Sequence, residues 1–356
     1  MDTINFGVWG VGRIGRQHAE IFACRDKEYK LVALCDRSKG ALEQTAAKFG
    51  GTPYHESAAF LADPAVDLVI IATRSLDHVR HATEALAAGK RVLLEKPIAV
   101  TTTDYEQMQQ LVARYPEQLY FGHNHRFEPA FMNAREIVAS GILGSVYLVK
   151  IRKHHNFMRR SDWQMQLEHG GGQLSVWGPH IIDQGLQWLG APVRKVESYL
   201  RRILTPCDGD DHVKITLFGK NEVVAELEIG NAFAVTEPYC AIYGDRGVLY
   251  YGQKQKEIVL KYLAPEFQWP AAEEAVVGDG PAGAMHSDPV LPWIEERRIV
   301  VPETSMWVQV EIELAARLYA ALKGITPFPV TSEQALEVVR ISEIVKEQNQ
   351  EFNWAE

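Results

Sequence analysis

The chain has 356 residues, of which 46% are hydrophobic and 23% charged, with a formal net charge of −9 at pH 7. This length suits two domains better than one core. The acidic balance argues against a broad nucleic-acid surface, and no apolar run approaches the ~20 residues of a membrane span. We therefore expect a small-molecule partner, with neither nucleic acid nor a membrane involved.

The N-terminal segment has the pattern of a dinucleotide-binding turn. An apolar run over residues 4–9 leads directly into Gly10-Val11-Gly12-Arg13-Ile14-Gly15. Gly10 permits a tight turn, Gly12 lets backbone N–H groups approach phosphates, and Gly15 lets the following helix pack closely on the strand.

An acidic residue follows at the distance that such a site requires. The apolar run over residues 31–35 ends in Asp36, about twenty residues after the glycine turn, where a carboxylate reaches the ribose hydroxyls. Asp36 should repel a 2′-phosphate, which favours NAD. Arg37 and Lys39 could instead bind that phosphate, so NADP is the alternative cofactor.

Residues 4 to about 122 alternate short apolar runs with helical patterns, which indicates βαβ units on a parallel sheet. The runs are almost continuously apolar, as in strands that are covered on both faces. Gly50-Gly51 and Gly89 fall where helices end, and the threonines at 101–103 where one begins. The expected strands are residues 4–9, 31–35, 67–73, 91–95 and 119–122.

Beyond residue 140 the apolar residues alternate in twos, which is typical of an antiparallel sheet with one wet face. We expect a long loop over 264–303 and helices over 305–323 and 332–348. The runs that should form an antiparallel meander are 145–154, 195–204, 211–219, 222–230, 239–250 and 257–263.

The predicted fold is therefore an α/β Rossmann domain joined to an α+β domain with an open, mainly antiparallel sheet. The first domain spans residues 1–122 and binds the cofactor. Residues 123–356 form a substrate-binding and oligomerisation domain, whose C-terminal helices can pack back on the first. Such a sheet commonly covers one face with a second subunit, so we expect a homodimer or homotetramer.

Lys96 is the first candidate for chemistry. Glu95-Lys96-Pro97 follows the fourth expected strand, at the edge where ligands bind in open α/β folds. Its ammonium could hydrogen-bond a substrate hydroxyl and stabilise the alkoxide that forms as hydride leaves. A solvated lysine is the alternative.

Two polar segments could complete the site. His180 and Asp183 follow Gly170-Gly171-Gly172 and can share one helix face. His180 is the candidate proton acceptor, which Asp183 could orient unless it binds substrate hydroxyls itself, while a structural histidine is the alternative. At the junction of the two halves, a polar loop offers three candidate substrate contacts, or is merely solvated: Asn124, His125 and Arg126.

The motif GVGRIG, the pair Cys35-Asp36, the stretch HxxxATEALAAGKRVLLEKP and the combination of GGG with GPHIID together resemble the glucose–fructose oxidoreductase/inositol dehydrogenase/rhizopine catabolism family. The resemblance spans nearly the whole chain. It implies that Lys96 is the active-site lysine and His180 the catalytic histidine. The cofactor site predicted on this basis comprises Gly10, Gly12, Arg13, Ile14, Gly15, Asp36, Arg37, Thr73, Arg74, His78, Glu95 and Lys96.

One position departs from the family pattern. Many dehydrogenases of this family have an aspartate four residues before the histidine, where this chain has Val176. Either His180 works with Lys96 alone, or another group supplies the missing polarity; the candidates are Glu168, His169 and Asp183. Pro179 adds a question of geometry, because it suits the first turn of a helix but would disturb one running through Val176.

Trp163 and Trp177 lie near this segment in sequence and are candidate substrate contacts. Aromatic rings pack against the C–H faces of sugars, although tryptophans of the buried core are the alternative. We therefore expect NAD(P)-dependent oxidation of a secondary alcohol on a sugar, sugar derivative or cyclitol. Val176 keeps two alternatives open: a glycoside-cleaving enzyme that uses transient oxidation and elimination, and a non-catalytic cofactor-binding sensor or repressor.

The cysteines and the N-terminus indicate the compartment. Cys24, Cys35, Cys207 and Cys240 show no C-x-x-C spacing, so buried thiols are expected rather than disulfides or zinc ligands, and no metal is predicted. The first apolar run begins at residue 4, which leaves no room for a signal peptide. A cytoplasmic location is therefore expected.

Overall fold

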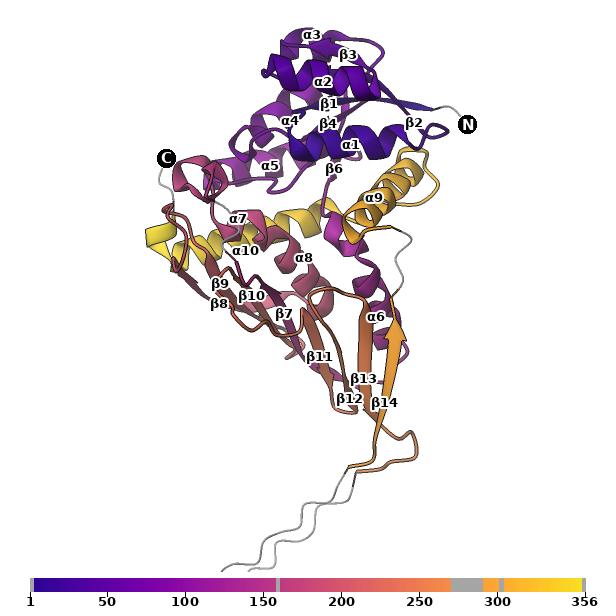
Figure 1. The fold of residues 1–356 in the computed structure, drawn as a ribbon, viewed down its shortest axis with the longest axis vertical. Coiled ribbons are helices and arrows are strands. Elements are labelled where there is room, and N and C mark those ends of the chain that lie inside the picture. The colour runs from indigo at the N-terminus through magenta and orange to yellow at the C-terminus, as the bar shows by residue number, and fades with distance from the viewer. Residues whose placement is uncertain (1–2, 158–160, 270–290, 301–303, 354–356) are drawn as a thin grey trace, which may run out of the picture.

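The computed structural model describes residues 3–157, 161–269, 291–300 and 304–353 (Figure 1). Its first sheet is parallel throughout and has the order β3-β2-β1-β4-β5-β6. This is the doubly wound order of a dinucleotide-binding domain, which confirms the predicted Rossmann fold. The strands are β1 (Ile4–Trp9), β2 (Tyr29–Cys35), β3 (Thr52–Tyr54), β4 (Leu68–Ile71), β5 (Arg91–Leu94) and β6 (Leu119–Phe121).

Strand β3 was not among the expected strands. It is a three-residue edge strand that contains Pro53, so it lacks the apolar run by which the other strands are recognised. Helices lie on both sides of this sheet (Figure 1), and the threonine expected to start one of them, Thr101, caps α5 through a reciprocal bond with Asp104. The helices are α1 (Arg13–Ala23), α2 (Lys39–Phe49), α3 (Ser57–Ala62), α4 (His78–Ala87) and α5 (Thr102–Arg114), with a 3-10 turn η1 (Ser75–Asp77).

The glycine turn between β1 and α1 is held by close backbone contacts. A Cβ on Gly15 would lie 1.8 Å from the carbonyl oxygen of Gly10, and one on Gly10, whose φ is +93°, would lie 2.7 Å from the backbone of Ala72. A Cβ on Gly12 would meet nothing within 4 Å. Two of the glycines therefore close the turn, while Gly12 borders open space.

The second sheet has eight strands in the order β14-β13-β12-β11-β7-β10-β9-β8. It is mainly antiparallel, as expected, but it is not the predicted meander: β7 lies between β11 and β10 and pairs with β10 in parallel. Its strands are β7 (Val146–His154), β8 (Val193–Arg201), β9 (His212–Gly219), β10 (Val224–Gly230), β11 (Cys240–Gly244), β12 (Gly247–Tyr251), β13 (Glu257–Leu263) and β14 (Trp293–Ile299).

Two further expectations for this sheet were wrong. The run 239–250 is not one strand but a hairpin of β11 and β12, which turns at Asp245-Arg246. The expected loop 264–303 contains β14, whose sequence WIEERRI is charged and largely exposed. An edge strand needs only one paired side and little burial, so its hydrophobic pattern is weak. Residues 270–290 and 301–303 of that predicted loop lie outside the described residues.

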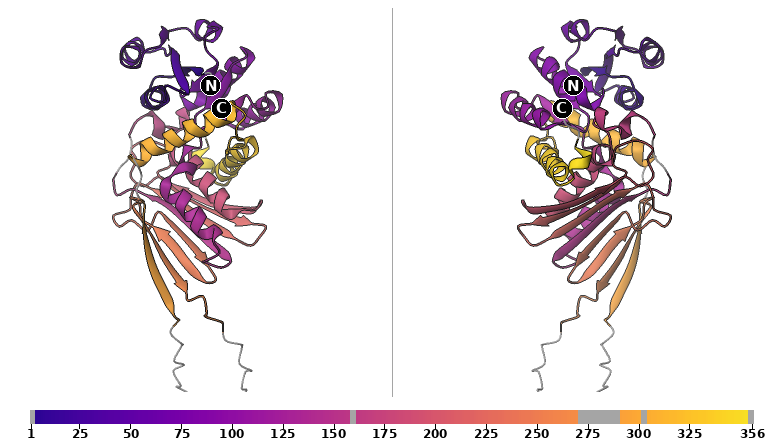
Figure 2. Two further views of the ribbon diagram at one scale, coloured as in Figure 1. Left: turned by 90° about the vertical axis from the view of Figure 1, so that its right-hand side faces the viewer. Right: turned by 90° about the vertical axis from the view of Figure 1, so that its left-hand side faces the viewer.

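Helices cover one face of the second sheet (Figure 2). The main ones are α6 (Pro129–Ala139), α8 (Gly178–Leu189) and α10 (Ser332–Gln348). The opposite face is polar, because Lys150 and Arg152 on β7 pair with Glu226 on β10, as the alternating pattern predicted. Short elements complete this half: η2 (Asn124–Phe127), η3 (Trp163–Met165), η4 (Leu167–His169), α7 (Gln173–Val176) and η5 (Gln350–Phe352).

Helix α9 (Met306–Leu322) belongs to the second half of the chain but packs on the first. Leu314 and Leu318 are fully buried in the same core as β1 and β2, and the Tyr29 hydroxyl donates a 2.8 Å hydrogen bond to the Ala315 carbonyl. Figure 1 shows α9 beside α1, between the two sheets. Helix α9 thus packs against the Rossmann half and joins it to the second half of the chain.

All four cysteines are free thiols, as expected, but their predicted burial is only partly right. Cys35 and Cys240 are buried, whereas Cys24 is exposed, because it caps the C-terminal end of α1 instead of facing the sheet. Among the helices of the described residues, none has the length and apolar character to cross a bilayer.

Gly15→Ala should destabilise the fold, because its methyl group would overlap the Gly10 carbonyl. We expect a loss of about 2–3 kcal/mol, measured as a lower midpoint of urea unfolding. Gly12→Ala is the matched control and should leave the midpoint unchanged, since a methyl group there meets open space. Equal midpoints for the two variants would contradict the role assigned to Gly15.

Candidate functional site

A cavity of about 420 Å³ lies between the two halves of the molecule. One side comes from the carboxyl edge of the first sheet and the glycine turn. The other side comes from η2, the α7–α8 segment and α9. The lining residues are Gly12, Arg13, Ile14, Gln17, Ala72, Thr73, Ser75, His78, Glu95, Lys96, Asn124, His125, Trp163, Gln164, Val176, Trp177, His180, Trp307 and Glu311.

A second cavity, of about 390 Å³, lies on the other side of the glycine turn and shares Gly12, Thr73 and Trp163 with the first. Its lining includes four more of the predicted cofactor residues: Gly10, Asp36, Arg37 and Arg74. The predicted cofactor residues thus line two adjoining hollows, as an extended dinucleotide requires. Gly15 is the exception, because it packs against Gly10 instead of lining either cavity.

The N-terminus of α1 suits a pyrophosphate. Gly12 is its N-cap, no side chain caps the helix, and the first turn contains no acidic residue. The N–H groups of that turn and the positive end of the helix dipole are thus available for phosphate oxygens. The open space beside Gly12 leaves room for them.

Asp36 is fixed by the backbone around it. Its carboxylate accepts hydrogen bonds from the N–H groups of Val11, at 2.8 Å, and Ser38, at 2.7 Å. The charge therefore stands at the end of β2 beside the glycine turn, where it opposes a 2′-phosphate. This arrangement agrees with NAD as the cofactor.

Lys96 follows β5 and reaches across to the other half. Its ammonium donates a 3.1 Å hydrogen bond to the carbonyl of Val176, so position 176 contacts the lysine through its backbone although its side chain is apolar. Both residues line the larger cavity. His78 supports this edge: its Nδ1 lies 2.8 Å from the Pro97 carbonyl and its Nε2 3.3 Å from that of Thr73.

His180 lies in the first turn of α8 and lines the same cavity as Lys96. Pro179 does not disturb a helix, because no single helix runs through Val176: α7 ends at Val176 and α8 begins at Gly178. Pro179 lies in the first turn of α8. Burial, the neighbouring His125 and Lys96 lower the pKa of His180 well below 6.5. The ring is therefore neutral at pH 7 and able to accept a proton, but it is a weak base.

Arg126 and Asp183 bind each other instead of facing the cavity. The guanidinium donates two hydrogen bonds to the carboxylate, of 2.7 and 2.5 Å, and both side chains are buried. Arg126 also donates to the Pro329 carbonyl, 2.9 Å away. Neither is among the described residues that line the cavity. The two predicted substrate contacts are thus paired with each other outside the cavity lining, which argues against Asp183 as the replacement for the acid absent at position 176.

The other candidates for that missing acid differ in position. Glu168 is 69% exposed at its side chain and lies 3.8 Å from His169. His169 borders a small neighbouring cavity of about 40 Å³ together with Lys96. Neither lines the larger cavity in the part of the chain that the structure describes.

The remaining predicted substrate contacts do line the cavity. Trp163 stacks under Arg74, whose guanidinium carbon lies 5.3 Å from the ring centre. Trp177 is buried, with the Lys153 ammonium 4.3 Å from its ring centre. Asn124 donates a 2.5 Å hydrogen bond to Glu311 on α9. Each of these residues therefore remains a candidate contact.

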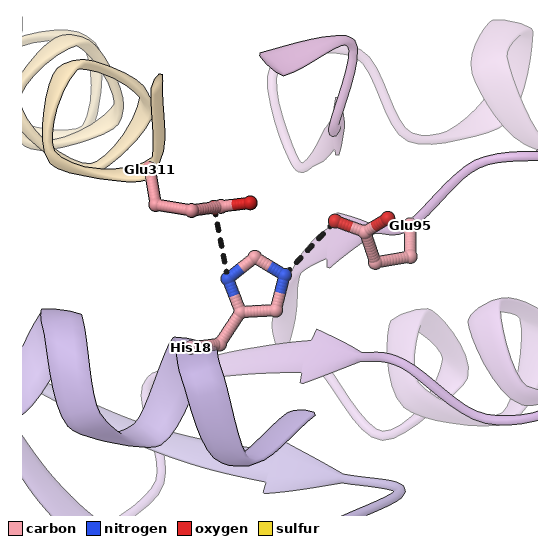
Figure 3. A group of neighbouring side chains, drawn as sticks. All are labelled: His18, Glu95 and Glu311. Atoms are coloured by element: carbon pink, nitrogen blue, oxygen red, sulfur yellow. Dashed lines mark hydrogen bonds and ion pairs between the residues drawn. The ribbon is translucent and has the colours of Figure 1, made fainter. Parts of the chain in front are cut away.

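A buried group of three charged residues underlies the cavity (Figure 3). His18 on α1 lies between Glu95 and Glu311, with its Nε2 2.9 Å from the former carboxylate and its Nδ1 3.4 Å from the latter. Burial opposes the charge on His18, but the two carboxylates outweigh it and raise its pKa to about 9. Its hydrogen bond and charge also hold the pKa of Glu95 below its usual value, against the effect of burial.

The same three residues have ligand atoms within 4.8 Å of one another, which is close enough for a metal ion. The two carboxylates, however, meet different nitrogens of one ring. A protonated imidazole donates a hydrogen bond to Glu95 through Nε2 and forms an ion pair with Glu311 through Nδ1, whereas a single ion bound to one nitrogen would not account for both contacts. The group is best described as a buried imidazolium between two acids.

Sequence reasoning missed several residues of this site: His18, Glu128, Gln164, Trp307 and Glu311. His18 and Glu311 interrupt the buried faces of α1 and α9, and an ionisable residue among buried positions is itself a signal, because such groups are almost never buried unless paired. Which partners they pair with depends on the packing of α9 against α1, and no local pattern predicts that packing.

Two segments of the chain match the profiles of a known protein family. Residues 4–123 match the profile of an oxidoreductase family with an NAD-binding Rossmann fold, and residues 131–250 match the GFO/IDH/MocA C-terminal domain. An uncharacterized oxidoreductase of Synechocystis is 30% identical to this chain over an alignment that covers 56% of this chain. The same alignment covers only 58% of the Synechocystis protein.

Two further relatives cover more of the chain. Inositol 2-dehydrogenase of Rhizobium meliloti is 26% identical over 78% of this chain and 80% of its own length. The crystal structure of an NAD-binding protein from Listeria innocua has the same fold, with a TM-score of 0.79 and 22% identity, and the match covers 98% of this chain and 95% of that one.

The imidazolium of His18 should make stability depend on pH. Because its pKa is raised from 6.5 to about 9, its contribution is complete below pH 6.5 and is lost as the pH rises through about 9. We expect urea unfolding to show a loss of a few kcal/mol over this interval in the wild type and a smaller loss in His18→Gln. Parallel pH profiles of the two proteins would contradict a charged His18.

Proposed function

Because the chain belongs to the GFO/IDH/MocA family of oxidoreductases, we propose that it transfers hydride between NAD and a secondary alcohol of a sugar, a sugar derivative or a cyclitol. One observation carries the proposal: Lys96, His180 and the glycine turn come from distant parts of the chain and line one cavity. The inositol dehydrogenase relative supports an alcohol on a ring as substrate.

The chain's own residues supply binding and proton transfer. The adjoining cavities would hold the two halves of NAD, with the pyrophosphate at the N-terminus of α1. When bound there, NAD would supply the hydride acceptor. Lys96 hydrogen-bonds the substrate oxygen and stabilises its negative charge, and a neutral imidazole beside it, which the family resemblance identifies as His180, takes the hydroxyl proton.

The cavity has features that suit a polyol. Trp163 and Trp177 offer aromatic faces for C–H groups, while Asn124 and Gln164 offer amides for hydroxyls. All four line the cavity with Lys96. Several polar groups around an aromatic wall favour a ring with many hydroxyls over a simple aliphatic alcohol.

Lys96→Met and His180→Ala should each lower kcat/KM by about 10²- to 10⁴-fold, because each removes a group that acts on the reacting oxygen. The assay offers sugars, glycosides and inositols with NAD, and follows both NADH absorbance and product mass. NAD binding, measured by calorimetry, should stay within a few-fold of the wild type in His180→Ala. Lys323→Met, at an exposed position, is the control and should keep full activity.

The outcomes also separate the alternatives. Turnover within a few-fold of the wild type in both variants would overturn the assignment of these residues. Release of an aglycone without net NADH would favour the glycoside-cleaving enzyme. NAD binding without turnover of any substrate in the set would favour a sensor or repressor.

We also propose that two copies pair through the outer face of the second sheet. Large side chains are exposed there, including Tyr199 on β8 at 51% and Trp293 on β14 at 50%. Light scattering should report a dimer or tetramer for the wild type and a smaller species for Trp293→Glu, because a charge would disrupt the packing of this exposed ring against the second copy. Ile325→Glu, which lies just after α9 away from this sheet, is the control. A monomeric wild type would contradict the proposal.

A further inference from the structure

His180 lacks a group that would stabilise a proton on it. Its Nδ1 is buried and has no hydrogen-bond partner among the described residues, and the residue one turn before it, where an acid would stand, is Val176. The charged and titratable groups around it include Lys96, Lys153 and two other histidines. An imidazolium at this position would therefore lie near the ammonium groups of Lys96 and Lys153, which disfavour it.

A second imidazole in the same cavity has the partner that His180 lacks. His125, on η2, packs against His180 with the ring centres 3.9 Å apart. Its Nδ1 lies 2.6 Å from a carboxylate oxygen of Glu128. His125 also lines the cavity with Lys96, so its other nitrogen is the one left for a ligand.

Glu128 is a fully buried carboxylate that is held ionised. It accepts hydrogen bonds from Gln184, at 2.9 Å, and Gln255, at 3.0 Å, in addition to that from His125. Burial alone would raise the pKa of Glu128, but these donors and the charge of Lys153 hold it below its usual value. An ionised Glu128 must receive a proton from His125 Nδ1, which leaves the lone pair on Nε2.

We propose that His125, oriented by Glu128, is the group that accepts the proton of the substrate alcohol, in place of a His180–aspartate pair. The inference rests on the proposed function and replaces only the identity of its base. Nε2 of His125 would take the hydroxyl proton as the carbon–oxygen single bond becomes a carbonyl, and NAD, when bound, would supply the acceptor for the hydride that leaves that carbon. The proton then leaves to solvent.

Glu128 acts through His125 and is thus a positioning residue. Its carboxylate holds the ring in one orientation and tautomer through the contact with Nδ1, as a carboxylate does for the histidine of a catalytic triad. The other charged and titratable groups around the two imidazoles are Lys96 after β5, Lys153 on β7, His123 before η2 and Glu311 on α9. His180 is left to hydrogen-bond the substrate.

The kinetic test compares the two imidazoles by their pH profiles. The variants are His125→Asn, His180→Asn and Glu128→Gln, assayed with NAD and whichever sugar, glycoside or inositol the wild type oxidises. His125→Asn should lower kcat by about 10²- to 10⁴-fold and abolish the acid limb of the kcat profile. His180→Asn should lower activity but keep that limb. Glu128→Gln should lower kcat, because no carboxylate then holds His125 with its Nε2 toward the substrate.

A matched control is available on the second sheet. His154 and Glu228 form a similar pair, with Nε2 3.0 Å from the carboxylate, but neither is among the described residues that line the cavity. Glu228→Gln should leave kcat and the pH profile unchanged. Loss of the acid limb in His180→Asn, with its retention in His125→Asn, would overturn the proposal and restore His180 as the base.

Nitrogen NMR of the histidine rings tests the same arrangement without turnover. In the protein with NAD bound, His125 should be the Nδ1–H tautomer, with a strongly downfield Nδ1 proton that is absent in His125→Asn and shifts in Glu128→Gln. An Nε2–H tautomer overturns the proposal even in an active enzyme. If the wild type oxidises no substrate in the set, the proposed function fails, whereas the tautomer still decides whether His125 presents a basic nitrogen to the cavity.

Discussion

One buried cation joins the three segments that enclose the cavity. His18 comes from the helix after the glycine turn, Glu95 from the end of a central strand, and Glu311 from a helix near the C-terminus (Figure 3). Each carboxylate would be costly to bury alone. The imidazolium holds the pKa of Glu95 low, whereas burial still raises the pKa of Glu311. The position of Lys96, the next residue after Glu95, therefore depends on a charge balance that spans the whole chain.

Local pattern was enough to predict the Rossmann half. The glycine turn, Asp36 and the apolar strands can each be recognised from a few consecutive residues. A parallel strand that is covered on both faces is almost continuously apolar, so its composition alone identifies it. Lys96 could be placed at the ligand edge for the same reason. The exception in this half was β3, an edge strand that buries too little to leave a hydrophobic signature, and β14 was missed in the second sheet for the same reason.

The partners of the polar residues could not be predicted in this way. Asp183 shares a helix with His180, and spacing alone places both in the cleft, yet its carboxylate meets Arg126 from a distant segment. Glu128 lies three residues from His125 and still gave no signal, because its role depends on amides brought by α8 and by the residues after β12. Helical spacing predicts which residues share a face but not what lies opposite that face.

The packing of α9 has a consequence for the order of folding during synthesis. The core around β1 and β2 includes Leu314 and Leu318, which leave the ribosome long after the strands they cover. Until then, Phe22 and Tyr29 would have an incomplete apolar cover. The Rossmann half therefore reaches its full apolar packing only when nearly the entire polypeptide has been made.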